Sequence, residues 1–292
     1  VAIVNDELRG IRTGLTQTIR DPDRLEETLQ AQREELEHFY GLDREWHSRL
    51  PAMVVRVITL DLGEARTLRS FKGSRNVTDL VLERLPYTML LITTASVITA
   101  VVGLWVGVKL ATQVGKPIDR VISYFSAVSY AMPAWWAGIL MILIFAFELR
   151  LLPPGGLYST PPPEGGLLRF LDLLWHSVLP VVTLVLVSLG AWIYTVRTMV
   201  LNTAQEFFVT VARAKGLPET RVMRRYIMRV AAPPIVTNVV LGLAGSLGGA
   251  ILTETVFNWP GMGRLYYDAV LAADENVLVA LTFMFTLIYV TA

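Results

Sequence analysis

Five long apolar segments constrain this chain more than any other feature. They cover residues 88–110, 121–147, 174–200, 235–257 and 277 to the end of the sequence. Each supplies about 20 mostly apolar residues, the length that a helix needs to cross about 30 Å of hydrocarbon. None shows the alternation of apolar and polar residues that marks a barrel strand. The segments therefore predict an all-α, multi-pass membrane protein, because a helix satisfies its own backbone hydrogen bonds in lipid.

Charge is concentrated ahead of these segments. Residues 1–84 hold 28 of the 51 charged side chains, although charged residues make up only 17% of the chain. The sequence therefore predicts a polar, largely helical region over residues 1–80 and a transmembrane domain over residues 81–292. In the first region, Asp21 or Asp23 can cap a helix that runs to about Tyr40. We also expect a further membrane helix before the first residue of this sequence.

The loops between the apolar segments predict how the chain lies in the membrane. The loops at residues 110–121 and 201–233 carry an excess of Lys and Arg, whereas the other two loops lean acidic. Loops rich in Lys and Arg stay on the cytoplasmic side. We therefore expect a multi-pass protein of the cell membrane with these two loops in the cytoplasm and residues 1–80 outside.

The sequence lacks the common catalytic and metal-binding patterns. Cysteine is absent, and His38, His47 and His176 do not have the spacing of metal ligands. The Gly115-Lys116 pair lacks the other glycine of a phosphate loop. The acidic residues of the spans lie near their ends, which does not favour ion coupling. We expect no catalytic residue, no bound cofactor, no metal and no nucleic-acid partner, so the energy for any transport must come from a partner.

The basic loop over residues 206–237 is the most informative polar segment. Asn202 or Thr203 can cap a helix that runs through residue 215, Gly216 can end it in a left-handed conformation, and Pro218 can start a second helix. Anionic lipid could hold such a loop, but the helix–glycine–helix plan favours docking to a cytoplasmic protein. Small side chains on the helix would allow close approach. The expected docking residues are Val209, Thr210, Val211, Ala212, Arg213, Ala214, Lys215, Gly216, Leu217 and Arg221.

Polar and aromatic residues in two of the spans are candidates for lining a transport path. Such side chains can contact a peptide backbone or the face of a sugar, and they also serve as helix packing and interface residues. Both interpretations stay open at this point. The candidates are Ser126, Ser129, Tyr130, Trp135, Trp136, Ser188 and Trp192.

Several stretches, in this order, resemble one family of membrane proteins. They are DLGEA (61–65), LERLPYT (82–88), SYAMPAWWAGILMILIF (129–145), ARAKGLPETRVMRRYIMRVAAPPIVT (212–237) and ETVFNWPGMGRLYYDAV (254–270). From about residue 60 to its end, the chain resembles the permease subunits of the dipeptide/oligopeptide family of binding-protein-dependent ABC importers. It departs from the general permease pattern where Thr210, Val211 and Ala212 replace Glu-Ala-Ala, and residues 21–75 are longer and more charged than in a typical relative.

The resemblance implies a fold, a mechanism and partners. The fold would be the transmembrane domain of a type I ABC importer, with six helices of which the first is largely missing here. The helix around residues 209–217 would be the coupling helix, seated in a groove of an ATPase. The implied partners are a homologous second permease, two ABC ATPase subunits that bind ATP and Mg²⁺, an extracytoplasmic solute-binding protein and membrane lipid. The cargo would be a short peptide or an oligosaccharide. The alternatives are an ion-coupled secondary transporter or channel, and a non-transporting membrane scaffold in which the basic loop serves assembly alone.

Overall fold

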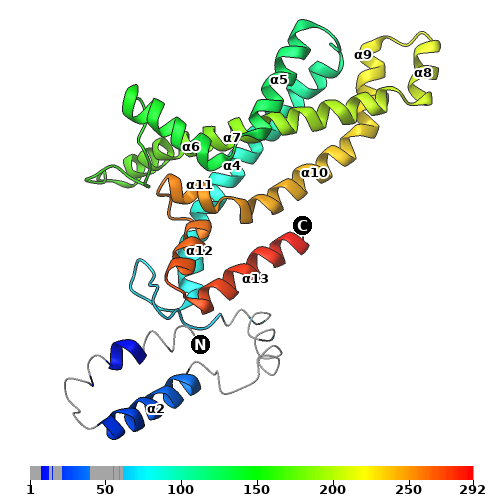
Figure 1. The fold of residues 1–292 in the computed structure, drawn as a ribbon. Coiled ribbons are helices and arrows are strands. Elements are labelled where there is room, and N and C mark those ends of the chain that lie inside the picture. The colour runs from blue at the N-terminus through cyan, green and yellow to red at the C-terminus, as the bar shows by residue number, and fades with distance from the viewer. Residues whose placement is uncertain are drawn as a thin grey trace. The chain divides into compact units, whose positions relative to one another are not determined.

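The computed structural model describes residues 8–12, 15, 22–39, 55, 59 and 62–291. The chain divides into two compact units, Val1–Asp61 and Leu62–Ala292. In the first unit, α2 (Pro22–Phe39) is an 18-residue helix rich in glutamate (Figure 1). This confirms the helix predicted from the aspartates near its start, although Tyr40, its expected end, lies outside the described residues.

The second unit is built from helices. Over its described residues, regular secondary structure is helical apart from one isolated bridge between Glu64 and Asn76. This confirms the all-α fold class. The elements are α4 (Val77–Ala111), α5 (Pro117–Ala131), α6 (Ala134–Met141), the π-helical η1 (Ile142–Glu148), α7 (Gly166–Ala204), α8 (Phe207–Ala214), α9 (Glu219–Val222), the π-helical η2 (Met223–Ile227), α10 (Met228–Gly249), α11 (Ile251–Val256), α12 (Met262–Leu271) and α13 (Glu275–Thr291).

Helices α4 and α7 form the centre of this unit. Among the described residues they are the two helices long and apolar enough to cross a membrane, and α5 with α6–η1 makes a third if that bent pair is one span. They contain the predicted spans 88–110 and 174–200. Gly107 brings α7 close, because a Cβ at this position would lie 2.8 Å from the Val196 side chain. A larger residue there would force the two longest helices apart.

The predicted span 121–147 is not one straight helix. Its two halves, α5 and α6–η1, are bent by 102° relative to each other. Met132 between them is extended, with φ −85° and ψ 121°. The residue before a proline is disfavoured in helical geometry, and Pro133 itself has no N–H to donate. The predicted span 235–257 is likewise broken, between α10 and α11 at Ala250.

The helix predicted from Asn202 or Thr203 through Lys215 is also wrong. Helix α7 continues to Ala204, the chain turns, and the separate helix α8 begins at Phe207. The Thr203 hydroxyl donates to the carbonyl of Met199 within α7 instead of capping a new helix. The apolar face of α7 reaches past the membrane span into a buried cluster, which explains why the helix runs on.

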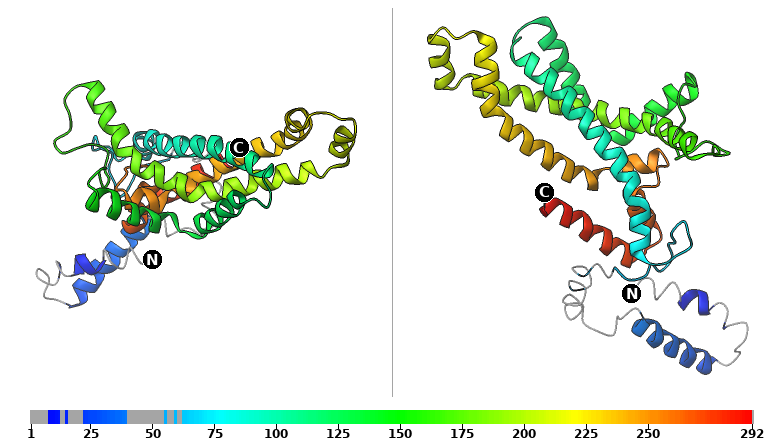
Figure 2. Two further views of the ribbon diagram at one scale, coloured as in Figure 1. Left: turned by 90° about the horizontal axis from the view of Figure 1, so that it is seen from above. Right: turned by 180° about the vertical axis from the view of Figure 1, so that it is seen from behind.

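Each end of this unit is held by its own buried cluster. We call the end with α8 and α9 the α8 end, and the end with α12 the α12 end; Figures 1 and 2 show that α10 leads from the first toward the second. Residues 62–80 share one core with α12 and α13 at the α12 end. The assignment of residues 1–80 to a separate extracytoplasmic region stays a prediction. That core contains Leu62, Ala65, Val77, Leu80, Val81, Met262, Leu265, Ala269, Val277, Ala280 and Leu281.

Candidate functional site

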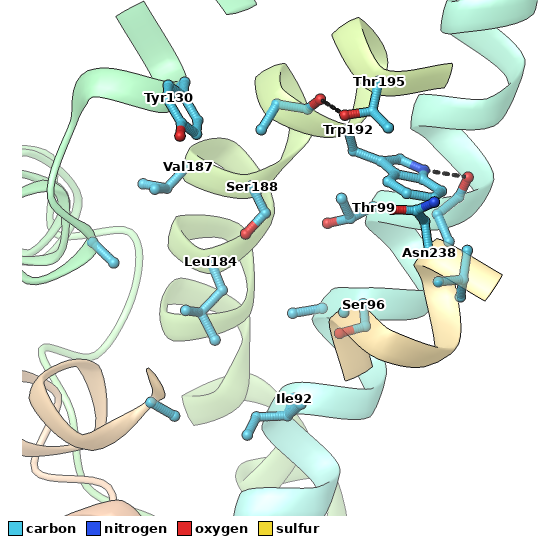
Figure 3. Close-up of a pocket in the computed structure, with 17 residues that line it drawn as sticks. Ile92, Ser96, Thr99, Tyr130, Leu184, Val187, Ser188, Trp192, Thr195 and Asn238 are labelled. Carbon is cyan, nitrogen blue, oxygen red and sulfur yellow. Dashed lines mark hydrogen bonds between the residues drawn. The ribbon is translucent and has the colours of Figure 1, made fainter. Parts of the chain in front are cut away.

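A cavity of about 560 Å³ opens between α4, α5, α6, α7 and α10 (Figure 3). Its walls are mostly apolar, with a set of hydroxyls and one amide at intervals. Among the described residues that line it, none is Asp, Glu, Lys or Arg. This wall offers hydrogen bonds and apolar contacts, but no charged side chain among the described lining residues, to a molecule in the cavity. Its polar and aromatic lining residues are Ser96, Thr99, Tyr130, Ser188, Trp192, Thr195 and Asn238.

Two polar groups in this wall are already bonded within their own helices. The Thr195 hydroxyl donates to the carbonyl of Ala191 at 2.9 Å, and the Asn238 amide donates to the carbonyl of Pro234 at 2.8 Å. Thr99 differs from them. Its hydroxyl is buried, and within the described part of the chain it has no hydrogen-bond partner. An unsatisfied buried hydroxyl is costly, so Thr99 is the polar group of this wall with most to gain from a new hydrogen bond.

The residues predicted to line a path separate into three groups. Tyr130, Ser188 and Trp192 line the cavity, and the Trp192 indole donates to the carbonyl of Ala100 on α4 at 3.3 Å. Ser126 and Ser129 are buried between α5 and α7. Two tryptophans of α6 are half-exposed and do not belong to the cavity wall: Trp135 and Trp136. Whether any of them contacts a transported molecule stays a prediction.

Helix α8 presents two faces. Val209 and Ala212, one turn apart, are 0% and 2% exposed, whereas Phe207 is 80% exposed. Ala212 thus packs inward, and the small side chain that α8 offers outside is Ala214. The exposed Phe207 was missed in the sequence, although two adjacent phenylalanines at a loop helix are themselves a signal. The inner face packs into a cluster with Val196, Val200, Val222, Ile227, Ala231 and Ile235.

The turn after α8 is fixed by a glycine and an ion pair. Gly216 has φ +72°, which confirms the predicted left-handed helix end. Arg213 donates two hydrogen bonds to Glu219, at 3.1 and 2.7 Å. These bonds lower the pKa of the Glu219 carboxyl. Of the expected docking residues, Val211 and Leu217 are half-buried and the following are exposed: Thr210, Arg213, Ala214, Lys215, Gly216 and Arg221.

Comparison with known proteins identifies the family. The family of binding-protein-dependent transport system inner membrane components matches residues 99–292, more than half of the chain. The chain belongs to this family. The oligopeptide transport system permease protein AppB of Bacillus subtilis is 28% identical to this permease over 253 residues, 87% of this chain and 78% of that protein. The di/tripeptide transport system permease protein DppB of Pseudomonas aeruginosa is 31% identical over 255 residues, 82% and 74% of the two chains.

A solved structure agrees on the fold. The permease is similar to the MetNI methionine ABC transporter in inward-facing conformations, with a TM-score of 0.55 and 18% identity over 75% of this chain and 95% of that one. At this identity the likeness concerns the fold alone. The expected family and the fold of an ABC importer transmembrane domain are therefore confirmed, and the permease is an inner membrane component of a transport system.

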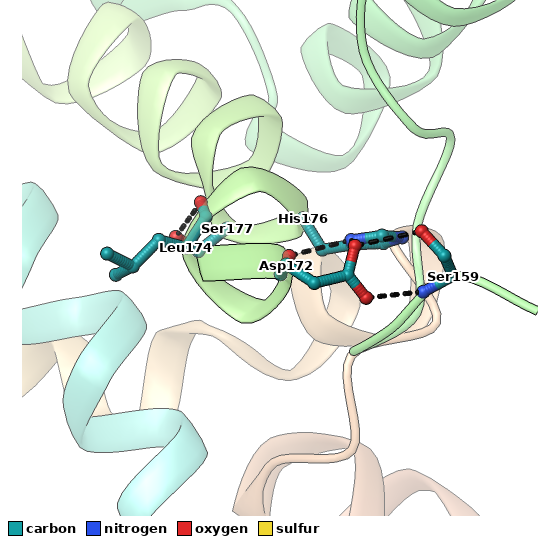
Figure 4. Close-up of polar contacts among 5 residues, drawn as sticks. All are labelled: Ser159, Asp172, Leu174, His176 and Ser177. Carbon is teal, nitrogen blue, oxygen red and sulfur yellow. Dashed lines mark hydrogen bonds and ion pairs between the residues drawn. The ribbon is translucent and has the colours of Figure 1, made fainter. Parts of the chain in front are cut away.

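A serine, an aspartate and a histidine of the permease meet where α7 begins (Figure 4). Ser159 donates its backbone N–H and its hydroxyl to Asp172, at 2.7 and 2.8 Å. His176 Nδ1 lies 2.9 Å from the backbone carbonyl of Asp172. The serine is bonded to the carboxylate and not to the imidazole, so this is not the arrangement that activates a serine nucleophile. The contacts instead anchor the proline-rich loop 149–165 to α7.

Two of the stretches that carry the family resemblance meet at the α12 end. Glu254 is fully buried and accepts hydrogen bonds from the Thr88 hydroxyl at 2.7 Å and from the backbone N–H of Arg264 at 2.9 Å. Met262 donates its backbone N–H to the same Thr88 hydroxyl at 2.7 Å. The Trp259 indole donates to the carbonyl of Tyr87 at 3.1 Å. This junction joins α4 to the α11–α12 connection, a contact that the sequence motifs alone did not reveal.

Proposed function

We propose that this permease is the transmembrane subunit of an ATP-driven importer and that α8 is its coupling helix. The two faces of α8 carry the proposal. The inner face is sealed into the buried cluster with α7 and α10, and the outer face leaves a phenylalanine exposed where a partner can cover it. A helix that only closed a loop would not need an exposed aromatic residue. We assign its partner as an ABC ATPase subunit.

In the proposed assembly, each subunit has a separate role. Two ATPase subunits bind ATP and Mg²⁺, and this chain contributes no catalytic residue and no cofactor site. A homologous second permease completes the path, and a solute-binding protein delivers cargo. The basic loops at 110–121 and 201–233 lie in the cytoplasm, and residues 1–80 with the α12 end lie outside. ATP binds to the ATPase subunits, and it shifts the importer between two conformational states only as far as its affinity for one state exceeds its affinity for the other.

Short peptides are the proposed cargo. The chain is similar to permeases that are named for oligopeptides and for di- and tripeptides. The cavity wall supports this choice, because its hydroxyls and amide match the amide groups of a peptide backbone and its lack of charge tolerates varied side chains. Stimulation of the assembled ATPase by oligosaccharides but not by di- and tripeptides would instead assign a sugar cargo.

Replacing Gly216 with valine tests the role of α8. A β-branched residue in the left-handed region costs about 1–2 kcal/mol, so the turn after α8 must change. We expect the chain to insert and assemble while cargo-stimulated ATP hydrolysis and uptake are lost. Gly73→Val is the matched control, because Gly73 has φ +86° and also has open space around its Cβ position, but lies at the α12 end. Equal loss in both variants, or none in Gly216→Val, contradicts the proposal.

Uptake measured without the ATPases tests the alternative of an ion-coupled carrier or channel. Such a protein would move cargo in vesicles that contain only the two permease subunits and an ion gradient. We expect no uptake there until the ATPases, ATP and the binding protein are added. Uptake without nucleotide would overturn the assignment as a subunit of an ATP-driven importer.

A further inference from the structure

Helix α5 is tied to α7 by a buried ion pair near the α8 end. Asp119 in the first turn of α5 is 6% exposed. It accepts hydrogen bonds from Nε and from a terminal nitrogen of Arg197 on α7, at 2.8 and 3.0 Å. The backbone N–H of Gly115 donates to the same carboxylate at 3.0 Å. The forked contact fixes both the distance and the orientation of the two helices.

A second tie joins the same helices farther along. The Ser129 hydroxyl donates to the carbonyl of Leu186 at 2.6 Å and accepts a hydrogen bond from the backbone N–H of Gly190 at 3.3 Å. A Cβ at Gly190 would lie 2.7 Å from the Cα of Ser126, so the two backbones are in close contact there. The ties are ten residues apart on α5, which is about 15 Å of helix. Two ties at this separation hold the helices against tilting as well as sliding.

Helices α5 and α7, joined by these two ties, connect α8 to the cavity. Val196 and Val200, on either side of Arg197 along α7, pack in the same buried cluster as Val209 of α8. At the other end of these two helices, Tyr130 of α5 and Ser188 of α7 both line the cavity. A displacement of α8 therefore reaches α7 directly, and it reaches α5 through the contact between α5 and α7, which the two ties fix.

We infer that the Asp119–Arg197 pair clamps α5 to α7 so that both cavity walls follow the movement of α8. The inference rests on the proposed function and names two positioning residues for it. With the clamp intact, a push on α8 moves both walls together. Without it, α7 moves and α5 lags, so ATP is hydrolysed with less cargo moved.

The chemistry of the pair favours this role over simple stabilisation. Removing two charges from water offsets most of their mutual attraction, so a buried ion pair is a poor source of net stability. Its advantage is a directional, two-point contact that an apolar pair lacks. The two roles therefore predict different results when the pair is replaced by apolar side chains of similar volume.

The first experiment uses the complete importer in vesicles and measures cargo taken up per ATP hydrolysed. In Asp119→Asn we expect this ratio to fall about fivefold or more, the usual size of a coupling effect, with assembly and basal ATP hydrolysis retained. The double variant Asp119→Leu, Arg197→Met should assemble well and show the same low ratio. Glu275→Gln is the control, since it breaks an ion pair with Arg66 at the α12 end. A double variant with the full ratio would show a structural role only and overturn the inference.

A covalent tie gives the decisive test. This sequence has no cysteine, so Ser129→Cys with Leu186→Cys can be joined by a short thiol-reactive linker without competing sites in this subunit. If α5 and α7 move as one body, the linked protein keeps its uptake per ATP. In the Asp119→Asn background the same link should restore the ratio. Loss of uptake on linking, or failure to restore the ratio, would overturn the inference.

The outcomes remain distinct from those that test the proposed function. If the unmodified complex shows no ATP-dependent uptake, the importer assignment fails. If it shows such uptake and Asp119→Asn keeps the full ratio, the importer assignment stands and only the clamp is wrong.

Discussion

The two ends of the permease each centre on a buried carboxylate that joins helices distant in sequence, but the partners differ. At the α12 end, Glu254 is held by the Thr88 hydroxyl and by the backbone N–H of Arg264 in the first turn of α12. At the α8 end, Asp119 is held chiefly by the long side chain of Arg197. The backbone donor is placed by the fold of α12, whereas the Arg197 contact depends on one side chain and is lost with a single substitution. The α12 end is therefore a frame fixed by the backbone, and the α8 end is held by a clamp between two side chains.

The largest effect is expected from breaking the fixed frame. In Glu254→Ala, the Thr88 hydroxyl and the backbone N–H of Arg264 lose their acceptor in a fully buried place, at about 1–3 kcal/mol each. We expect little folded protein, measured as the yield of monodisperse permease in detergent and its melting temperature. Glu254→Gln keeps one acceptor oxygen and should fall between this variant and the wild type. A melting temperature of Glu254→Ala equal to that of the wild type would mean that the α12 end is not held by this junction.

A smaller loss is expected from separating α5 and α7. In Gly190→Ala the new Cβ would meet the backbone of Ser126 at 2.7 Å, and overpacking of this kind costs about 1–3 kcal/mol. Gly166→Ala is the control, because Gly166 lies on the same helix and a Cβ there has open space. We expect a lower melting temperature and a lower uptake per ATP for Gly190→Ala alone. Equal melting temperatures for the two variants would contradict the close contact.

The comparison also shows where sequence reasoning reached its limit. The apolar segments 88–110 and 174–200 correctly predicted the long helices α4 and α7, and Gly216 correctly marked the end of the loop helix, because both signals are local. The 102° bend at Met132–Pro133 was not predicted, since a proline can also open or kink a helix without breaking it. The partners of Asp119 and Glu254 lie 78 and 166 residues away, at Arg197 and Thr88, and a single sequence contains no signal for such pairing.

A modest effect is expected in the cavity between the two ends. Thr99→Val keeps the shape of the side chain and removes a hydroxyl that has no partner among the described residues. We expect unchanged or slightly higher stability and, if cargo bonds to this hydroxyl, a KM for uptake raised up to about tenfold, the value of one neutral hydrogen bond. Thr195→Val is the control, because its hydroxyl is bonded to Ala191. Identical uptake kinetics for wild type and Thr99→Val would show that cargo does not bond to the Thr99 hydroxyl.

The smallest effect concerns the exposed ion pair of the α8 end. Because the pKa of Glu219 is lowered in the folded loop by its bonds from Arg213, the pair's contribution is complete above the ordinary carboxyl pKa and disappears as the pH falls through the lowered value. An exposed pair contributes at most about 1 kcal/mol. Hydrogen exchange of the segment 205–218 should therefore be constant near neutral pH and rise slightly only in acid, and Glu219→Gln should abolish that rise. A large loss of protection in Glu219→Gln at neutral pH would show that the ion pair, and not the buried face formed by Val209 and Ala212, holds α8 in place.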